Sequence, residues 1–285
     1  MRTSTLSRLI GGIGGAWLGL MFFSTGALAQ AEGMPTPGGI GLPAMVTPVG
    51  HEAQAFYNDV LLPVITLIPI FVLFLLIYVM WRFNEKTNPV AVKDHHNITL
   101  EVVWTIIPCL ILLGMAFPSM RLLTHQVEVP EASVTIKVTG SQWYWKYDYP
   151  QDQGGGFSFE QHGKADSELQ PGELRMLAVD NEAVVPVGEV VKVFVTATDV
   201  IHAFGIPSFG IRQDAIPGRM NETWFKIEKE GVYYGECYFL CGKDHAYMPI
   251  AIRAVSRPEY EKWLAEAKTK FAGGDERKQH VAANQ

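Results

Sequence analysis

The chain has 285 residues, enough for one sizeable domain with additional segments. Its composition is 48% hydrophobic and 18% charged, and the net charge of −6 argues against a nucleic-acid partner. The three cysteines are too few for a disulfide framework. Three apolar runs precede residue 124, and the remainder has the composition of an ordinary globular domain.

The first apolar run has the form of a secretory signal peptide. Two arginines precede the apolar stretch Leu9–Phe23, and Ala27-Leu28-Ala29 provides a small-residue cleavage site. An uncleaved membrane helix is the alternative, but the many glycines and the small-residue exit favour cleavage. We therefore expect residues 1–29 to be a signal peptide and residues 30–55, rich in Gly and Pro, to form a flexible N-terminal segment.

The second and third apolar runs predict a transmembrane helix hairpin. Neither Val60–Trp81 nor Val102–Met120 contains a charged side chain, and about 20 apolar residues cross the ~30 Å hydrocarbon layer. Prolines in both runs are tolerated when neighbouring groups satisfy the freed carbonyls. Two buried core helices are less consistent with a short polar loop and with so little preceding chain. We expect a hairpin over 56–124, with helices at about 60–82 and 101–122.

Positive charges predict the orientation of this hairpin. Arg82, Lys86 and Lys93 lie in or beside the loop, whereas residues 30–59 contain no Lys or Arg. The positive-inside rule places the loop in the cytoplasm. Together with the signal peptide, this predicts a bacterial inner-membrane protein whose N-terminus and C-terminal domain are periplasmic.

Residues 125–257 have the pattern of an all-β domain. Polar and apolar residues alternate in several short runs, and Gly and Pro separate them, which is typical of an antiparallel sandwich or barrel. The candidate strands are Ser133–Thr139, Leu174–Val179, Val190–Thr196, Glu222–Glu228 and Val232–Tyr234. The final segment, 258–285, is expected to contain a short amphipathic helix over Glu259–Lys268 and then a disordered polar tail.

A cluster of metal-ligand side chains follows the last of these strands. Cys237, Cys241, His245 and Met248 lie in one short stretch, and His202 follows a separate strand. Thiolate, thioether and imidazole groups suit copper, and a blue-copper site uses two His, one Cys and a weakly bound Met. The additional Cys could bridge a second metal ion.

Three other interpretations of the cluster stay open from ligand types alone. Cys237 and Cys241 could form a disulfide in an oxidising compartment, which leaves the His and Met unexplained. The Cys and His residues could bind structural zinc, which leaves Met248 unused and requires an unusual spacing. His245 and Met248 could also be ordinary packing residues.

The pattern Cys-x₃-Cys-Gly-x₂-His-x₂-Met-Pro, with Asp199-Val-Ile-His202 upstream, resembles the binuclear copper A centre of cytochrome c oxidase subunit II. Further stretches that resemble this family are Gly140–Trp145, Pro171–Arg175, Val179–Asn181 and Asp214–Arg219. The resemblance covers roughly residues 55–265. It implies a two-helix transmembrane hairpin followed by an all-β, cupredoxin-like Greek-key sandwich.

The resemblance also implies a ligand set for two copper ions. The implied ligands are His202, Cys237, Cys241, His245, Met248 and the backbone carbonyl of Phe239. The family has Ser-Glu where this chain has Tyr238-Phe239. A carbonyl ligand tolerates any side chain, but the family's glutamate helps bind magnesium at the interface with subunit I, and phenylalanine cannot coordinate a cation. The resemblance therefore leaves the magnesium contact of this subunit open, with Glu236, where the family has Gln, as the alternative ligand.

Further roles follow from the resemblance alone. It implies that Trp143 is the residue through which electrons are taken up from cytochrome c. The acids implied in a docking patch are Asp148, Asp180 and Asp199, and the residues implied to face subunit I are Asp214 and Arg219. Acids outnumber bases in the β-domain, which speeds encounter with a basic partner. Packing for Trp143 and a solvated surface for each acid are the simpler alternatives.

Glu101 lies at the cytoplasmic start of the second helix, with His96 nearby. The resemblance implies that Glu101 marks the mouth of a proton pathway completed by subunit I, with His96 assisting, whereas an interfacial anchor is the alternative. Cys109 lies within the helix and is expected to be an apolar packing residue.

The resemblance implies subunit II of a cytochrome c oxidase, which accepts electrons from cytochrome c and passes them to a haem in subunit I. Oxygen reduction and proton pumping would occur in subunit I, so this chain transfers electrons without reducing oxygen itself. The implied partners are subunits I and III, cytochrome c and membrane lipid. A copper-free quinol oxidase subunit and a periplasmic copper-delivery protein are alternatives; the intact ligand set argues against the first, and the aromatic motif and Glu101 argue against the second.

Overall fold

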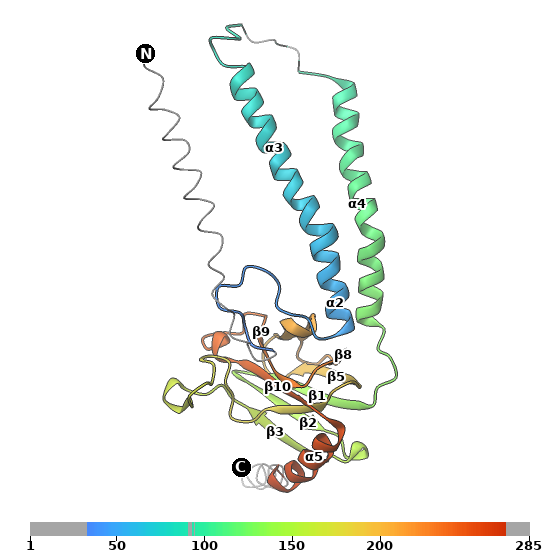
Figure 1. The fold of residues 1–285 in the computed structure, drawn as a ribbon, viewed down its shortest axis with the longest axis vertical. Coiled ribbons are helices and arrows are strands. Elements are labelled where there is room, and N and C mark those ends of the chain that lie inside the picture. Colours follow the sequence, from blue (N-terminus) through green and yellow to red (C-terminus); the bar gives the residue numbers. More distant parts are fainter. Residues whose placement is uncertain (1–32, 91–92, 94, 272–285) are drawn as a thin grey trace, which may run out of the picture. The chain divides into compact units, whose positions relative to one another are not determined.

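A computed structural model describes residues 33–90, 93 and 95–271 of the chain (Figure 1). The expected signal peptide, 1–29, and the polar tail beyond residue 271 lie outside the described residues.

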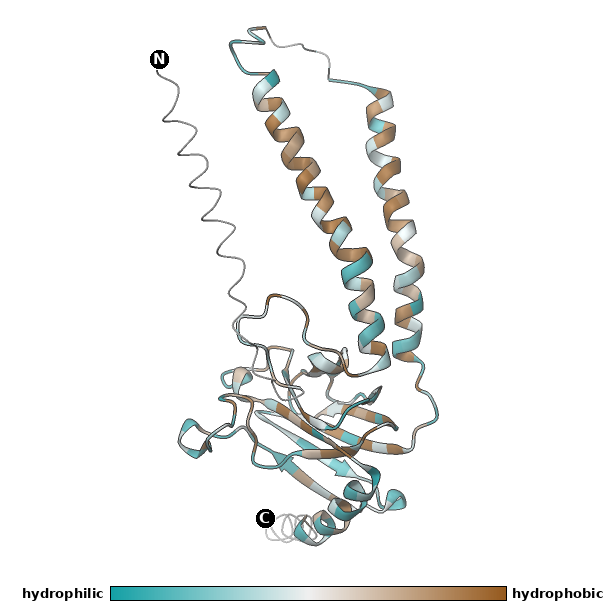
Figure 2. Ribbon diagram, in the orientation of Figure 1, coloured by the Kyte–Doolittle hydropathy of each residue, from teal (hydrophilic) through white to brown (hydrophobic). Residues whose placement is uncertain are grey.

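Two long helical segments form the hairpin that the sequence predicts. In the first, α2 (Pro48–Ala55) continues through a π-helical turn, η1 (Phe56–Leu61), into α3 (Leu62–Arg82). The second is α4 (Ile98–Val127). Both segments are long and apolar enough to cross a membrane, and hydrophobic residues cover most of α3 and much of α4 (Figure 2).

Capping residues explain where the two segments begin. The Thr47 hydroxyl accepts a hydrogen bond from the Gly50 N–H at 3.0 Å, at the start of α2. The Asn97 side chain accepts one from the Leu100 N–H at 3.1 Å, while the Glu101 carboxylate accepts one from the Asn97 N–H at 3.0 Å. This reciprocal capping satisfies N–H groups that a helix start leaves free, and it starts α4 before residue 101.

Part of the 30–55 segment is not the flexible lead-in that its Gly and Pro content predicts. Met45 and Val46 are buried, and Val46 forms backbone hydrogen bonds to Ser208 and Glu228 at 3.0 and 2.9 Å. These bonds fix the chain just before α2 begins. Burial of two apolar side chains and pairing of the backbone outweigh the flexibility of the preceding glycines.

The β-domain consists of two five-stranded sheets (Figure 1). The first sheet has the order β3-β2-β1-β5-β8 and the second β4-β10-β9-β6-β7. The strands of the first are β1 (Val134–Ser141), β2 (Tyr144–Tyr149), β3 (Phe157–Gln161), β5 (Val190–Ala197) and β8 (Asn221–Lys226). Those of the second are β4 (Ala183–Pro186), β6 (His202–Ile206), β7 (Ile211–Ala215), β9 (Gly231–Cys237) and β10 (Pro249–Val255).

Alternating residues of these strands form the core. Strand β5 alternates between buried and half-buried positions throughout, and Ile136, Val193, Phe204 and Tyr233 are fully buried. Strand pairing is antiparallel except for β1 with β5 and β10 with β4. The arrangement confirms the predicted fold, a two-helix hairpin followed by a cupredoxin-like β-sandwich.

The expected strand over Leu174–Val179 is absent. The Leu177 and Ala178 N–H groups both bond to the Leu174 carbonyl, at 3.1 and 2.8 Å, and Met176 has a φ of 67°. These local bonds close a turn, so the apolar residues of the run cannot form a ladder with a neighbouring strand.

Helix α5 (Arg257–Phe271) contains the predicted amphipathic stretch and packs by its aromatic residues. The Trp263 ring lies 5.2 Å from that of Tyr149, and the Phe271 ring lies 4.9 Å from that of Phe159. The helix therefore covers aromatic residues of β2 and β3 on the first sheet.

Candidate metal centre

Pairing between β6 and β9 brings the separated ligand candidates together. Phe204 of β6 lies opposite Cys237 of β9, which places His202, the first residue of β6, beside the end of β9. Cys241 and His245 lie in the loop between β9 and β10, and Met248 directly precedes β10. The β9–β10 loop therefore supplies three of the candidates, the last residue of β9 supplies Cys237, and the neighbouring strand β6 supplies His202.

The donor atoms form a compact group. Cys237 Sγ lies 3.8 Å from His202 Nδ1 and 3.8 Å from Cys241 Sγ. His245 Nδ1 lies 3.6 Å from Cys241 Sγ, and the Phe239 carbonyl oxygen lies 3.3 Å from Cys237 Sγ. The nitrogen and sulfur atoms of His202, Cys237 and Cys241 all lie within 4.8 Å of one another.

The site is largely shielded from solvent. Cys237 and Cys241 are each 4% exposed, Met248 is 1% exposed and His202 is fully buried. Both cysteines are free thiols, so the disulfide interpretation is not the state that the structure shows. The Met248 carbonyl accepts a hydrogen bond from the Cys237 N–H at 3.2 Å, which ties the end of the loop to its beginning.

The two thiols differ in acidity. Burial opposes ionisation of Cys237, but its interactions with His202 and with backbone groups lower the pKa to about 7. Burial, and then the charge of Cys237, raise the pKa of Cys241 to about 12. The site therefore favours one thiolate at neutral pH, and a bound cation would favour the second.

Asp199 orients the imidazole of His202. Its Oδ1 lies 2.9 Å from His202 Nε2, which leaves Nδ1 toward the sulfur atoms. Asp199 also accepts hydrogen bonds from the Gln142 and Val200 N–H groups, at 2.7 and 2.6 Å. Burial opposes ionisation of Asp199, but the bonds to His202 and to the two N–H groups hold its pKa below the usual range. The carboxylate is thus fixed and charged next to the imidazole.

These residues fit a copper site. Two thiols, two imidazoles, a thioether and a carbonyl form a soft donor set, and the thioether has no place in a structural zinc site. Metal-binding imidazoles ordinarily donate their second N–H to a carboxylate, as the Asp199–His202 pair permits. The low exposure of Cys237, Cys241 and Met248 would keep water from the ion.

Trp143 lies in the turn between β1 and β2, outside both strands. The turn aims its indole at the ligand-bearing loop, where a methyl group built on Gly242 would lie 3.2 Å from Trp143 Cζ2. Trp145 is fully buried with its ring 6.0 Å from that of His202, and Tyr144 stacks on His162 at 4.8 Å.

The three acids expected in a docking patch have different surroundings. Asp148 is paired with Lys146 and Lys137, at 3.3 and 3.9 Å. Asp180 accepts the His162 N–H at 2.8 Å, and Asp199 is bound to the imidazole within the metal site. The role of Asp199 beside His202 was not inferred from the sequence, although its position three residues before an imidazole was an available signal.

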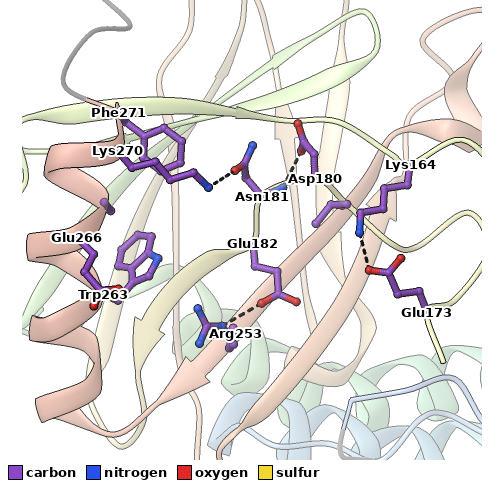
Figure 3. A pocket seen from close by; sticks show the side chains of 12 residues that line it. Lys164, Glu173, Asp180, Asn181, Glu182, Arg253, Trp263, Glu266, Lys270 and Phe271 are labelled. Carbon is purple, nitrogen blue, oxygen red and sulfur yellow. Dashed lines mark hydrogen bonds and ion pairs between the residues drawn. The ribbon is translucent and has the colours of Figure 1, made fainter. Parts of the chain in front are cut away.

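Asp180 also lines a hollow of about 460 Å³ between α5 and the neighbouring strands (Figure 3). The cations of this hollow already have partners: Lys164 contacts Glu173 at 2.5 Å, Arg253 contacts Glu182 at 2.9 Å, and Lys270 donates to the Asn181 side chain at 2.9 Å. Lys164 and Arg253 are therefore paired with acids, whereas Lys270 contacts a neutral amide; since four acids and three bases line the hollow, it carries no net positive charge for an anion.

Two further pairs of residues were expected to have a role: Asp214 and Arg219 at the subunit I interface, and Glu101 and His96 in a proton pathway. Asp214 of β7 is paired with Arg212 at 3.4 Å, and the Arg219 N–H closes a turn on the Ile216 carbonyl at 3.1 Å. Glu101 lies in the first turn of α4, where its Oε1 is 3.6 Å from His96 Nδ1.

Gln142 is a site residue that the sequence reasoning left without a role. Its side-chain Nε2 donates to the Cys241 carbonyl at 2.7 Å, and its backbone N–H donates to Asp199. The residue therefore connects the turn that carries Trp143 to both sides of the donor group. Its position directly before Trp143 in the aromatic motif was the only available hint.

Family models and full-length relatives both match this chain. The family model "cytochrome c oxidase subunit II, periplasmic domain" matches residues 134–255, and the corresponding transmembrane-domain model matches residues 35–122. A probable cytochrome c oxidase subunit 2 from Rickettsia bellii is 43% identical over 94% of this chain and 96% of its own length. The cytochrome c oxidase subunit 2 of Cereibacter sphaeroides is 41% identical over 86% of this chain and 87% of its own length.

A solved structure is also similar to the β-domain. The periplasmic domain of subunit II of the cytochrome oxidase of Bradyrhizobium japonicum is 56% identical, with a TM-score of 0.47, and the match covers 50% of this chain and 99% of that one. The two family models and the full-length relatives together span the helix hairpin and the β-domain. The chain therefore belongs to the cytochrome c oxidase subunit II family.

Proposed function

We propose that this chain takes up electrons from cytochrome c at a two-copper centre and passes them to the haem-bearing subunit I of its oxidase. The observation that carries the proposal is the convergence of Cys237, Cys241 and His202, whose donor atoms lie within 4.8 Å of one another. A second thiol is one more than a mononuclear copper site requires.

Each residue of the centre has a defined task in this proposal. Cys237, Cys241, His202 and His245 would hold the two ions, and in both imidazoles Nδ1 is the nitrogen that lies near a cysteine sulfur. Met248 and the Phe239 carbonyl would complete the set. When bound, the two copper ions would supply a one-electron carrier whose charge is shared, so that little rearrangement accompanies electron transfer.

The surrounding residues would keep this centre rigid and dry. Asp199 holds the His202 ring in one orientation, and the Cys237–Met248 backbone bond closes the loop. A rigid, water-poor site costs little reorganisation when its charge changes. Trp143 would accept electrons first, because its indole lies against the loop that carries Cys241.

The hairpin would anchor the centre on the periplasmic side of the inner membrane. The cytoplasmic loop carries the positive charges, and Glu101 with His96 would mark the mouth of a proton pathway at that end. Asp214 and Arg219 would face subunit I, subunit III would complete the assembly, and residues 1–29 would be removed on export.

Copper analysis and electron paramagnetic resonance of the purified oxidase test this proposal. We expect two copper ions per chain beyond those of the haem-bearing subunit, with a mixed-valence signal that Cys237→Ser abolishes. Cys109→Ser, in the membrane helix, is the matched control and should leave the signal intact. A Cys237→Ser oxidase that keeps the signal, or a wild-type chain that binds no copper as in a quinol oxidase subunit, would refute the proposal. Loss of copper to a mild chelator without electron uptake from cytochrome c would favour a copper-delivery role.

A further inference from the structure

Gly242 lies directly after Cys241, at the point where the ligand-bearing loop meets Trp143. A methyl group built on Gly242 would lie 3.1 Å from Gln142 Nε2, 3.2 Å from Trp143 Cζ2 and 3.5 Å from Trp143 Nε1. The contacts at 3.1 and 3.2 Å are closer than most side-chain contacts in packed proteins, so a larger residue fits only if the indole or the amide shifts. Gly242 also has a φ of 125°, which side chains rarely adopt.

Packing holds the Trp143 indole in its position beside Gly242. The ring packs against the hydrophobic core of the β-domain. Its Nε1 is buried, and within the described part of the chain it has no hydrogen-bond partner. The position of the indole therefore depends on the shape of its surroundings, and the backbone of Gly242 forms one side of them.

Gln142 holds the turn that carries Trp143 in place against the loop that carries Cys241. Its Nε2 donates to the Cys241 carbonyl at 2.7 Å, and its backbone N–H donates to Asp199 Oδ2 at 2.7 Å. Gln142 thus joins the turn before Trp143 both to the loop at Cys241 and to the segment that carries Asp199. A side chain at position 242 would contact the Gln142 amide as well as the Trp143 ring.

We propose that Gly242 is a positioning residue for electron uptake, because its lack of a side chain lets the Trp143 indole seat against the metal-binding loop one residue from Cys241. The inference rests on the proposed function of Trp143. The step itself moves one electron from a reduced c-type haem of the partner, which is oxidised, to the metal centre, which is reduced. No bond forms or breaks, and the rate depends on the separation between the indole and the loop.

Gly242→Ala in the intact oxidase tests the proposal. We expect electron uptake from saturating reduced cytochrome c to slow by at least about tenfold, since small misplacements of a reacting group have effects of this size. The cytochrome c concentration for half-saturation should stay unchanged, because docking is not altered. The resonance spectrum of the copper centre should also persist. An unchanged uptake rate with an intact spectrum would overturn the proposal.

Gly188→Ala is the matched control for backbone strain. Gly188 has a φ of 77°, and a methyl group there meets no atom within 4 Å. This variant therefore introduces the backbone strain of a positive φ without a steric clash. Its rate of electron uptake should equal that of the wild type. A tenfold loss in this control would attribute the effect to strain and overturn the proposal.

A double-mutant cycle keeps the test decisive if Gly242→Ala assembles poorly. Trp143→Phe removes the part of the indole that lies nearest Gly242, so Gly242→Ala should cost less thermal stability of the copper spectrum in that background than in the wild type. Equal costs in both backgrounds would show that the indole is not the neighbour that matters, and would refute the inference.

The cycle also separates this inference from the proposed function. If Trp143→Phe alone takes up electrons as fast as the wild type, then Trp143 is not the uptake residue and the proposed function of this residue fails. The stability cycle would still report whether Gly242 and Trp143 are packed against each other. Coupling in the cycle without an effect on uptake would therefore reject the electron-uptake role while confirming the contact.

Discussion

Asp199 Oδ1 lies 2.9 Å from Nε2 of the fully buried His202. The pair resembles the carboxylate–imidazole arrangement by which metalloproteins fix a ligand ring and its tautomer. A surface acid expected to attract a partner is therefore also part of the support of the metal centre. The two roles predict different consequences of mutation.

Replacing Asp199 with Ala should weaken copper binding about tenfold to hundredfold, the usual effect of losing such a partner. The copper spectrum should also change, because the His202 ring is free to rotate. Asp148→Ala is the control: its carboxylate pairs with Lys146 at 3.3 Å on the surface, so its loss should alter only the salt dependence of cytochrome c binding. Equal copper affinity in wild type and Asp199→Ala would exclude the supporting role.

The copper-free protein should release a thiol proton near neutral pH. Interactions with His202 and backbone groups outweigh burial and lower the pKa of Cys237 to about 7, whereas that of Cys241 is raised to about 12. Because the Cys237 pKa is lowered from 9.0 to about 7 in the folded chain, the stability that its thiolate contributes is fully present above the unfolded value and is lost as the pH falls from there through about 7.

Ultraviolet thiolate absorbance during a pH titration measures this step. In a Cys109→Ser background, which removes the remaining thiol, we expect one transition centred near 7 that disappears in Cys237→Ser. A single transition near the ordinary cysteine value of about 8.5 would contradict the expected ionisation.

Replacing Phe239 with Glu should leave copper content unchanged and add a cation site. Phe239 is 39% exposed, and the group expected to bind copper is its backbone carbonyl. A carboxylate at this position supplies the hard oxygen ligand that magnesium prefers. Metal analysis of the assembled oxidase should therefore show more tightly held magnesium, or manganese in its place, than in the wild type.

Phe239→Gln is the matched control, because it is similar in size to glutamate but uncharged. It should keep the copper and should not gain the magnesium. Full magnesium occupancy in the wild-type oxidase would show that this side chain is not needed at the interface, and loss of copper in Phe239→Glu would contradict the carbonyl assignment.

Gln161 should be important for folding of the β-domain. Its side chain is 1% exposed, donates to the Asn181 and Ala251 carbonyls, and accepts from the Ala251 N–H and the Tyr147 hydroxyl. Gln161→Leu would leave these buried groups unpaired and should lower the free energy of unfolding by about 3 kcal/mol. Denaturation followed by circular dichroism measures the change. Exposed Gln151→Leu should stay within about 0.5 kcal/mol of the wild type, and an equal effect of the two variants would exclude the network.

Local sequence patterns predicted the architecture because the responsible forces act over neighbouring residues. Uncharged apolar runs have the length needed to cross the hydrocarbon layer, and they became α3 and α4. Alternation at Val190–Thr196 predicted β5 because side chains of a strand alternate between its faces. The same reasoning failed at Leu174–Val179, where a local turn replaced strand pairing.

The sequence by itself determined the chemical types of the donor group and the length of the membrane hairpin, since both are properties of single residues and short runs. Only the tertiary structure decided that His202 Nδ1 lies 3.8 Å from Cys237 Sγ, because the pairing of β6 with β9 sets that distance. The contacts of Asp199 with the imidazole and of Trp143 with Gly242 were likewise decided by strand register and turn geometry. Such contacts join residues that are distant in the chain, and no local pattern encodes their separation.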